Sequence, residues 1–219
     1  MSAHLEITDD IAVLNLGDDE NRFSPDWLAE VNGFLDRIES GEAKALVTTG
    51  TGKFYSNGLD LDWLGAHSDQ GDWYVDQVQQ LLARVLVAPV PTVAAVNGHA
   101  FGAGSMLGMA HDFRVMRVDR GYYCFPEVDI HIPFTPGMAT LIQSKLTPAA
   151  AVEAMTTGRR YGGADAEAAG LVTATAPEGK GVSTAVDLVA PLKGKDPGTL
   201  HAIKSTMFAS VTAALRGTA

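Results

Sequence analysis

The chain has 219 residues, of which 46% are hydrophobic, and this is enough apolar material for the core of one globular domain. Its formal net charge of −10 excludes an ordinary nucleic-acid binder, because phosphate recognition needs clustered Lys and Arg and the chain has no such run. A single cysteine excludes an intramolecular disulfide. With no signal-like N-terminus and no apolar window of membrane-spanning length, we expect a cytoplasmic protein without nucleic-acid or membrane partners.

Hydrophobic period and turn signals predict alternating strands and helices in the first half of the chain. Ser24 followed by Pro25 marks a helix start, because serine caps the first turn and proline fits the first helical position. Strands separated by helices imply a mainly parallel sheet, whose ligands bind beyond the carboxyl ends of its strands. The expected elements are strands at 5–7 and 11–16, a helix from 25 to about 41, a strand at 45–49, a glycine-bearing loop to about 62, a helix at 73–87 and a strand at 92–96.

The second half of the chain is expected to become mostly helical. We expect residues 1–145 to form the core with the active-site loops, and residues 146–219 to form a helical C-terminal region of the same domain. Residues 191–198 are expected only to join two helices. The expected elements are a short buried helix at 106–111, strands at 113–118 and 122–125, helices at 138–146, 149–156 and 165–169, a short segment at 171–175, and helices at 184–189 and 200–215.

The stretch 95–106 reads AVNGHAFGAGSM, and its three glycines indicate that something passes close to this backbone. A dinucleotide loop and a P-loop are disfavoured, because the glycines follow neither G-x-G-x-x-G nor a pattern that ends in Gly-Lys-Ser/Thr. A serine nucleophile elbow also fails, because Ser105 lacks a glycine two positions before and after it. A thioester oxygen is the third candidate. It would require two converging backbone N–H groups, and the loop at 53–61, KFYSNGLDL, offers a second donor.

Four ordered motifs resemble those of the enoyl-CoA hydratase/isomerase (crotonase) family. YSNGLDL at 55–61 is similar to F-S-A-G-x-D-L, and 91–106 is similar to P-x-I-A-A-V-N-G-x-A-x-G-G-G-x-E. PEV at 126–128 and the block at 157–172 resemble the P-E-x and T-G-x-x-x-x-A-x-E-A-x-x-x-G-L-V motifs. The resemblance implies an α/β fold, namely a crotonase-type spiral of ββα units with a helical C-terminal region used for trimerisation or as a lid. It also implies an acyl-CoA substrate with no separate cofactor, and a homotrimer or dimer of trimers.

The same resemblance implies the roles of three residues at the site. The backbone N–H groups of Leu59 and Ala103 would form the oxyanion hole, and Glu127 would carry the proton. Hydratases of the family use two glutamates, but Met106 stands in the place of the first one. One carboxylate is enough to move a proton between two carbons, and the run from 119–121 to 127–130 resembles in particular the Δ3,Δ2-enoyl-CoA isomerase branch. We therefore expect an isomerase that converts a 3-enoyl-CoA into the 2-trans isomer through a thioester enolate.

Side chains near these motifs are candidates for contact with the substrate, although core packing is the ordinary role of such aromatic and methionine residues. No metal is expected, because no His, Cys, Asp or Glu cluster has ligand spacing. His131 stands where the family usually has glycine, and an imidazole there could tune Glu127 or replace the missing acid. The expected substrate-binding residues are Tyr55, Asn57, Gly58, Phe101, Gly102, Met106 and His131.

Two alternatives stay open at the level of sequence. The first alternative is a different enzymatic activity, either a hydratase-like one or that of a Ser/His thioester hydrolase. The hydrolase is considered because Ser105 and His131 resemble parts of the motifs of Clp-type serine peptidases, which share the spiral fold. The other alternative is a non-catalytic acyl-CoA-binding paralogue. It is favoured by Met106, by Asn57 in place of the usual alanine, and by residues 134–138 in place of a glycine-rich segment.

Overall fold

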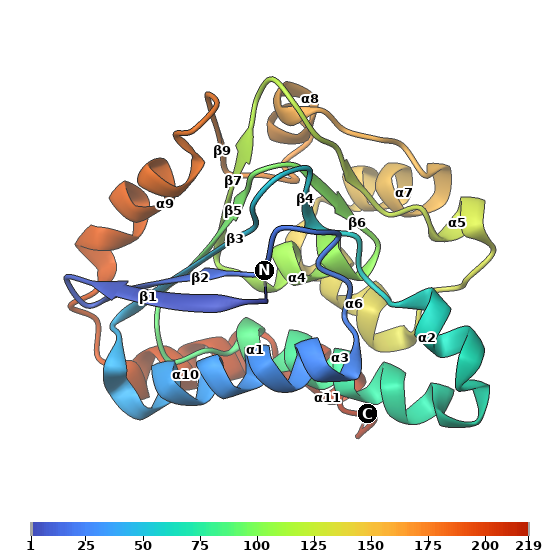
Figure 1. Cartoon of the computed structure of the whole chain (residues 1–219), viewed down its shortest axis with the longest axis horizontal. Coiled ribbons are helices and arrows are strands. Elements are labelled where there is room, and N and C mark those ends of the chain that lie inside the picture. Colours follow the sequence, from blue (N-terminus) through green and yellow to red (C-terminus); the bar gives the residue numbers. More distant parts are fainter. Residues whose placement is uncertain (1, 219) are drawn as a thin grey trace.

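The larger of two β-sheets forms the centre of the molecule (Figure 1), whose computed structural model describes residues 2–218. The antiparallel β1–β2 hairpin confirms the predicted pair of strands around Asp9 and Asp10, and every other neighbouring pair in this sheet is parallel. In spatial order its strands are β1 (His4–Thr8), β2 (Ile11–Asn15), β3 (Ala45–Thr49), β5 (Thr92–Val96), β7 (Phe113–Arg117) and β9 (Ala174–Ala176).

A second, parallel sheet consists of β4 (Phe54–Ser56), β6 (His99–Phe101) and β8 (Tyr123–Cys124). Its strands follow β3, β5 and β7 in the chain, so that each turn of the chain contributes one strand to each sheet before it enters a helix. We did not predict β4 and β6, because strands of three residues are too short to show a period of two. This repeated strand, strand, helix unit places the start of a helix beside each short strand.

Helices cover both faces of the large sheet, as Figure 1 shows. Successive strand residues point to opposite faces, so Leu46 packs on the side of α1 (Pro25–Arg37) and α3 (Gly71–Leu86), whereas Val47 packs against α9 (Gly181–Val189). The predicted caps of α1 are confirmed. Ser24 Oγ accepts a hydrogen bond from the Trp27 N–H at 3.2 Å, and a π-helical turn that carries Gly41 at φ +98° ends the helix.

The remaining helices surround the small sheet and close the chain back on the core. The predicted single helix at 200–215 is wrong, because Phe208 leaves the helical conformation with φ −110° and ψ 23°. The short segment at 171–175 leads into the edge strand β9. These helices are α2 (Leu61–Ala66), α4 (Ala103–Ala110), α5 (Glu127–Ile130), α6 (Pro136–Lys145), α7 (Pro148–Thr157), α8 (Gly163–Ala168), α10 (Pro197–Met207) and α11 (Ala209–Leu215).

The C-terminal helix α11 packs on α6 and α3 of its own chain. The approach is close, because a Cβ on Gly137 would lie 2.7 Å from the Leu215 Cα atom. Residues 190–196 join α9 to α10, so the linker predicted at 191–198 is confirmed except for its last two residues, which begin α10. A role of residues 146–219 in trimerisation or as a lid stays a prediction.

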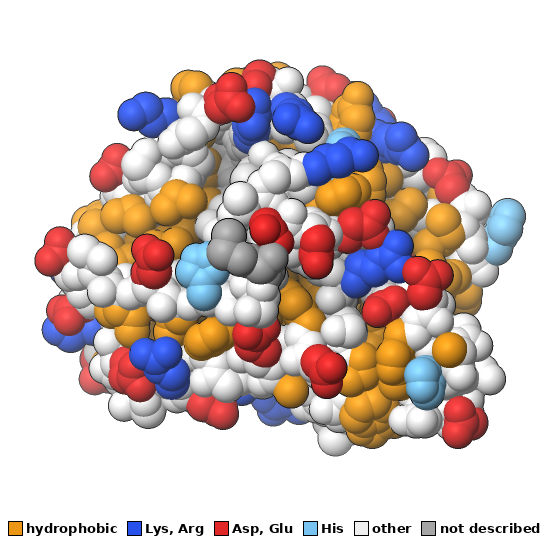
Figure 2. All heavy atoms as spheres, in the orientation of Figure 1, with side chains coloured by type: hydrophobic (Ala, Val, Ile, Leu, Met, Phe, Trp, Pro, Cys, Tyr) orange, Lys and Arg blue, Asp and Glu red, His pale blue; other side chains and the backbone are white. Residues whose placement is uncertain are grey.

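Apolar side chains also reach the surface. Figure 2 shows a group of them at the lower right, over α2 and the start of α3, where Leu61 is 42% and Trp73 is 48% exposed. Within residues 2–218, no helix combines the length and the hydropathy needed to cross a bilayer.

Candidate active site

Two loops meet at the start of α4, and Gly58 makes their contact possible. Gly58 has φ +79°, and a Cβ at this position would lie 2.7 Å from the Phe101 carbonyl oxygen and 2.8 Å from the Ala103 nitrogen. Any side chain would therefore push the two backbone segments apart. This contact brings the residue after Gly58, Leu59, next to the first residue of α4.

The backbone N–H groups of Leu59 and Ala103 are both free to bind a ligand. Neither donates a hydrogen bond to another of the residues that the structure describes. Ala103 is the first residue of α4, where the N–H groups have no acceptor in the preceding turn and the helix dipole favours negative charge. Two such donors on adjacent segments form the arrangement that stabilises an oxyanion.

These two loops, α5 and the start of α6 enclose a cavity of about 420 Å³. Its wall is largely apolar on the side of α6, where Phe134 and Met138 lie, and polar around Asn57 and Arg22. Seven of the residues expected at the site line this cavity: Asn57, Leu59, Phe101, Gly102, Ala103, Met106 and Glu127.

Glu127 is the buried carboxylate of the cavity. It begins α5, is only 7% exposed, and its Oε2 atom has no hydrogen-bond partner among residues 2–218. Burial raises the pKa of Glu127 to about 7, because the ionised form loses its hydration. Gly102 faces this carboxyl group, since a Cβ there would lie 3.3 Å from Oε1. A carboxylate that titrates near neutrality suits a general base.

The structure places three expected substrate contacts outside the wall of the cavity. Tyr55 is fully buried in the core, where its hydroxyl oxygen lies 2.7 Å from Thr48 Oγ1. Gly58 shapes the site through its backbone contact with Phe101 and Ala103. His131 caps α5 in the left-handed conformation with φ +59° and is exposed, while its neighbours Ile130 and Ile132 line the cavity. Tyr55 therefore packs in the core, whereas contact of His131 with the substrate stays a prediction.

Ser105 does not face the cavity either. Its side chain is fully buried, and its Oγ atom lies 2.6 Å from the Ala100 carbonyl oxygen and 2.9 Å from that of Cys124. The hydroxyl therefore ties α4 to two strands of the small sheet. A Ser/His hydrolase would need this oxygen to reach a substrate, so the geometry disfavours that alternative.

Two cations lie on the cavity wall, Arg22 and Arg160, and neither occupies a defined position of the four motifs. Arg22 is paired with Glu20 and Asp62. Arg160 lines the wall, and its Cζ atom lies 5.7 Å from the centroid of the Phe101 ring. It forms no ion pair within the described part of the chain. It is brought there by backbone hydrogen bonds between Tyr161 and Tyr123, which pair segments far apart in the sequence. No local pattern reports such a pairing.

Most glycines of the stretch 95–106 make room for neighbouring backbone. A Cβ on Gly98 would lie 2.1 Å from the Lys53 carbonyl oxygen, and one on Gly104 would lie 2.4 Å from that of Ser56. Only Gly102 lies on the cavity wall. The expectation that these glycines admit a thioester therefore needs correction, because two of them admit the adjacent loop.

We expect Gly104→Ala to lower the free energy of unfolding by about 1–3 kcal/mol, because its methyl group would overlap the backbone oxygen of Ser56. Gly33→Ala in α1 is the control. A Cβ at Gly33 meets no atom within 4 Å, so helix propensity should raise the stability by about 1 kcal/mol. Urea unfolding followed by circular dichroism measures both, and equal stability of Gly104→Ala and wild type would contradict this close packing of the two loops.

Residues 2–218 contain no group of three or more His, Cys, Asp and Glu side chains arranged to hold a metal ion. The cavity offers the backbone N–H groups of two loops and one buried carboxyl group. Such a site can remove a proton next to a carbonyl group and hold the resulting enolate.

Comparison with known proteins agrees with this chemistry. Residues 6–218 match the family model of enoyl-CoA hydratase/isomerase. Enoyl-CoA delta isomerase 3 of Arabidopsis thaliana is 38% identical over 183 residues, which are 78% of this chain and 76% of that protein. The peroxisomal enoyl-CoA delta isomerase 2 of the same plant is 37% identical over 182 residues, again 78% of this chain and 76% of that protein. The apo structure of an enoyl-CoA isomerase of Mycobacterium tuberculosis superposes with a TM-score of 0.91 at 26% identity, and the alignment covers 99% of this chain and 95% of that one.

The chain belongs to the enoyl-CoA hydratase/isomerase family. The expected crotonase-type fold is confirmed, as is the resemblance to the isomerase branch. One of these relatives is named as peroxisomal, and the cytoplasmic location expected from the sequence stays a prediction.

Proposed function

We propose that the protein is a Δ3,Δ2-enoyl-CoA isomerase that uses Glu127 as its only proton carrier. The observation that carries this proposal is a single buried carboxylate in an apolar cavity with two unpaired backbone N–H groups. Two relatives that are named enoyl-CoA delta isomerases support it. The substrate is a 3-enoyl thioester of coenzyme A, and coenzyme A enters only as part of that substrate.

The reaction is two proton transfers through one enolate. Ionised Glu127 removes a proton from C2, and the electron pair of that C–H bond moves toward the thioester carbonyl. The N–H groups of Leu59 and Ala103 donate to the negative oxygen of the resulting dienolate. Glu127 then returns the same proton to C4, which leaves the double bond between C2 and C3 and restores the carboxylate.

Hydration is disfavoured by the side chain at position 106 of the cavity wall. Met106 is only 1% exposed, and its thioether can neither activate water nor donate a proton. Adding water across a double bond would then lack one of its two proton-transfer groups, each of which is worth about 10²–10⁴ in rate. A shuttle between C2 and C4 needs only one.

The proposal is tested with a 3-enoyl-CoA whose conversion to the conjugated 2-enoyl isomer is followed by ultraviolet absorbance. We expect turnover of this substrate and negligible hydration of crotonyl-CoA in a parallel reaction. Tight binding of the 3-enoyl-CoA without turnover would instead identify a non-catalytic binder, and hydration at a comparable rate would identify a hydratase.

The activity should depend on pH through Glu127. Because burial raises the pKa of this carboxyl group to about 7, it is protonated and inactive as a base below that value. We expect kcat/KM to rise with pH around a midpoint near 7 and then to level off. A profile that stays flat between about pH 5.5 and 8 would contradict the role of this buried carboxylate.

A further inference from the structure

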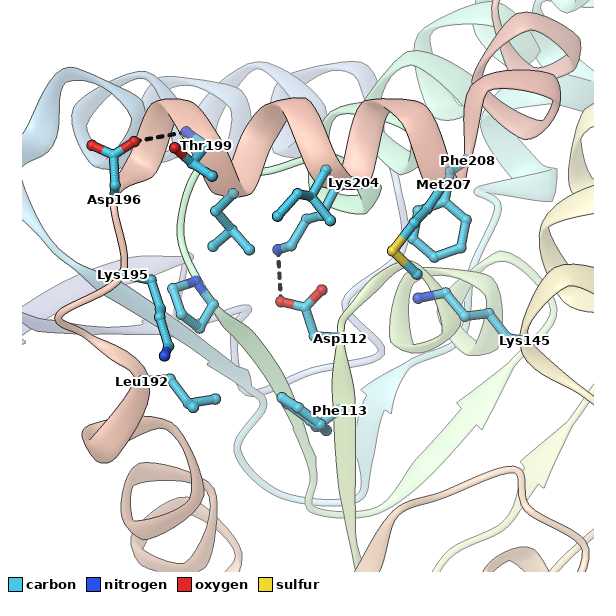
Figure 3. Close-up of a pocket in the computed structure, with 13 residues that line it drawn as sticks. Asp112, Phe113, Lys145, Leu192, Lys195, Asp196, Thr199, Lys204, Met207 and Phe208 are labelled. Atoms are coloured by element: carbon cyan, nitrogen blue, oxygen red, sulfur yellow. Dashed lines mark hydrogen bonds and ion pairs between the residues drawn. The ribbon is translucent and has the colours of Figure 1, made fainter.

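An apolar groove lies on the surface away from the candidate active site. It has a volume of about 570 Å³ and lies between α10, residues 192–196 and the residues that open β5 and β7 (Figure 3). We call it the α10 groove. It shares no lining residue with the cavity around Glu127. Its apolar wall is formed by Phe113, Leu192, Leu200, Ile203, Met207 and Phe208.

One end of the α10 groove carries an amine without a counter-ion. Lys145, the last residue of α6, lies beside Met207 and Phe208 in Figure 3. Its Nζ atom donates a hydrogen bond to the His111 carbonyl oxygen at 3.2 Å and lies 4.4 Å from the Phe208 ring centroid. Within residues 2–218 it forms no ion pair with a carboxylate.

The charged groups around this amine are mainly positive. Asp112 is the acid nearby, but its Oδ2 atom is bound by Lys204 Nζ at 2.6 Å. Arg114 is buried and donates to carbonyl oxygens of the backbone, and burial lowers the pKa of His111 to about 4, so that its ring is neutral. The charges of Arg114 and Lys204 therefore oppose the protonation of Lys145, whereas Asp112, although paired with Lys204, favours it.

Burial, followed by the charge of Arg114, lowers the pKa of Lys145 to about 8. An exposed lysine ordinarily has a pKa near 10.4, so that only about 0.4% of it is neutral at pH 8. About half of an amine with a pKa near 8 is neutral under the same conditions. The neutral form is the nucleophile, and desolvated lysines next to other cations are activated in this way.

We propose that Lys145 is a site of covalent acylation by acyl thioesters whose aliphatic chain lies in the α10 groove. The neutral amine attacks the thioester carbonyl carbon, a C–N bond forms, and the C–S bond breaks. One amine proton leaves with the sulfur as free thiol, and the product is an N-acyl-lysine amide. No oxidant or further reactant is needed. The acylation does not depend on Glu127 or on the proposed isomerisation.

The aliphatic chain supplies selectivity for this site. Ile203 and Met207 are 51% and 67% exposed, and an acyl chain along α10 would cover both of them. Burial of each methylene group strengthens binding about fourfold, so a longer chain should direct the thioester to Lys145 increasingly well. An exposed lysine without such a groove gains nothing from chain length.

The test compares lysines within the wild-type protein after incubation with acetyl-CoA or octanoyl-CoA at pH 8, by quantitative peptide mass spectrometry. The exposed Lys180 is the internal control. At pH 8 the neutral fraction of Lys145 is roughly a hundred times that of an ordinary exposed lysine. A less basic amine is also a weaker nucleophile, which reduces this advantage about tenfold, so we expect Lys145 to react about ten times faster than Lys180. The preference should be larger for octanoyl-CoA than for acetyl-CoA.

Two further measurements keep the outcome clear. The rate at Lys145 should level off above about pH 8, because most of this amine is then neutral. Met207→Gln, which places an uncharged polar group on the rim of the α10 groove, should reduce octanoyl transfer to Lys145 and leave acetyl transfer unchanged. Equal rates at the two lysines, or a preference that does not grow with chain length, would overturn the proposal whether or not the protein is an isomerase.

Discussion

Replacing Glu127 by glutamine is expected to lower the rate of isomerisation by at least about 10³-fold while the protein stays folded. Glutamine has nearly the same shape as glutamate, but its amide cannot take a proton from C2. The other carboxylate on the cavity wall, Asp62, is exposed and paired with Arg22, so it offers no substitute for the buried base. The measurement is kcat/KM with a 3-enoyl-CoA at pH 8, followed by the absorbance of the conjugated product.

The stability of Glu127→Gln distinguishes lost chemistry from lost folding. Burial raises the pKa of Glu127 to about 7 from an ordinary value of 4.5, so the folded state disfavours its ionised form. This penalty is absent below pH 4.5 and complete above pH 7. We expect the variant to be more stable than wild type at pH 8, by up to about 3 kcal/mol, and this difference should shrink as the pH falls.

Asp129→Asn is the control for Glu127→Gln. Asp129 lies on the same short helix, but it is exposed and lies outside the cavity wall. It should lose less than about twofold of the activity, because surface substitutions away from a site have small effects. Equal activity of Glu127→Gln and Asp129→Asn would remove Glu127 from the reaction.

The second large effect is expected from Ala103→Pro, which removes one oxyanion donor from the backbone. Proline has no N–H group, and it is tolerated at the first position of a helix, which Ala103 occupies in α4. Loss of one such donor typically costs about 10²–10³ in kcat, and the ring would also occupy the place of the oxyanion. We expect a fall of at least this size with a folded protein, as shown by circular dichroism.

Ala103→Gly is the matched variant, because it keeps the N–H group and adds no atom. Its activity should fall by less than tenfold, so the difference between the two variants reports the donor itself. If proline and glycine at this position gave the same rate, the oxyanion would have to be bound elsewhere.

The long elements of this fold could be predicted from the sequence because each carries a local signal. Ser24 and Pro25 predict the start of α1, and the mainly apolar strands β3 and β5 have the length and flanking turns of buried strands. The break at Phe208 could not be predicted, because the apolar spacing continues across it. The short strands β4 and β6 are defined by pairing with distant segments, and such pairing leaves no local period.

The same division applies to the site. Motifs placed Leu59, Ala103 and Glu127 at the ends of elements, and these three residues do line one cavity. Arg160 lies within the block at 157–172 but was not predicted at the site, because only the pairing of Tyr161 with the distant Tyr123 brings it to the cavity wall. Tyr55 was expected at the site because it opens the motif at 55–61, but successive side chains of a strand point in opposite directions and that of Tyr55 lies in the core.

The small sheet has a consequence for how this architecture can change its chemistry. Each of its strands leads into the start of a helix or its preceding loop, and these three equivalent places hold Leu59, Ala103 and Glu127. Each of three successive turns of the chain thus places one residue at the wall of the same cavity. In the proposed mechanism Leu59 and Ala103 act through their backbone N–H groups alone. A substitution at the third place can therefore change the reaction while these two donors still bind the oxygen of a thioester.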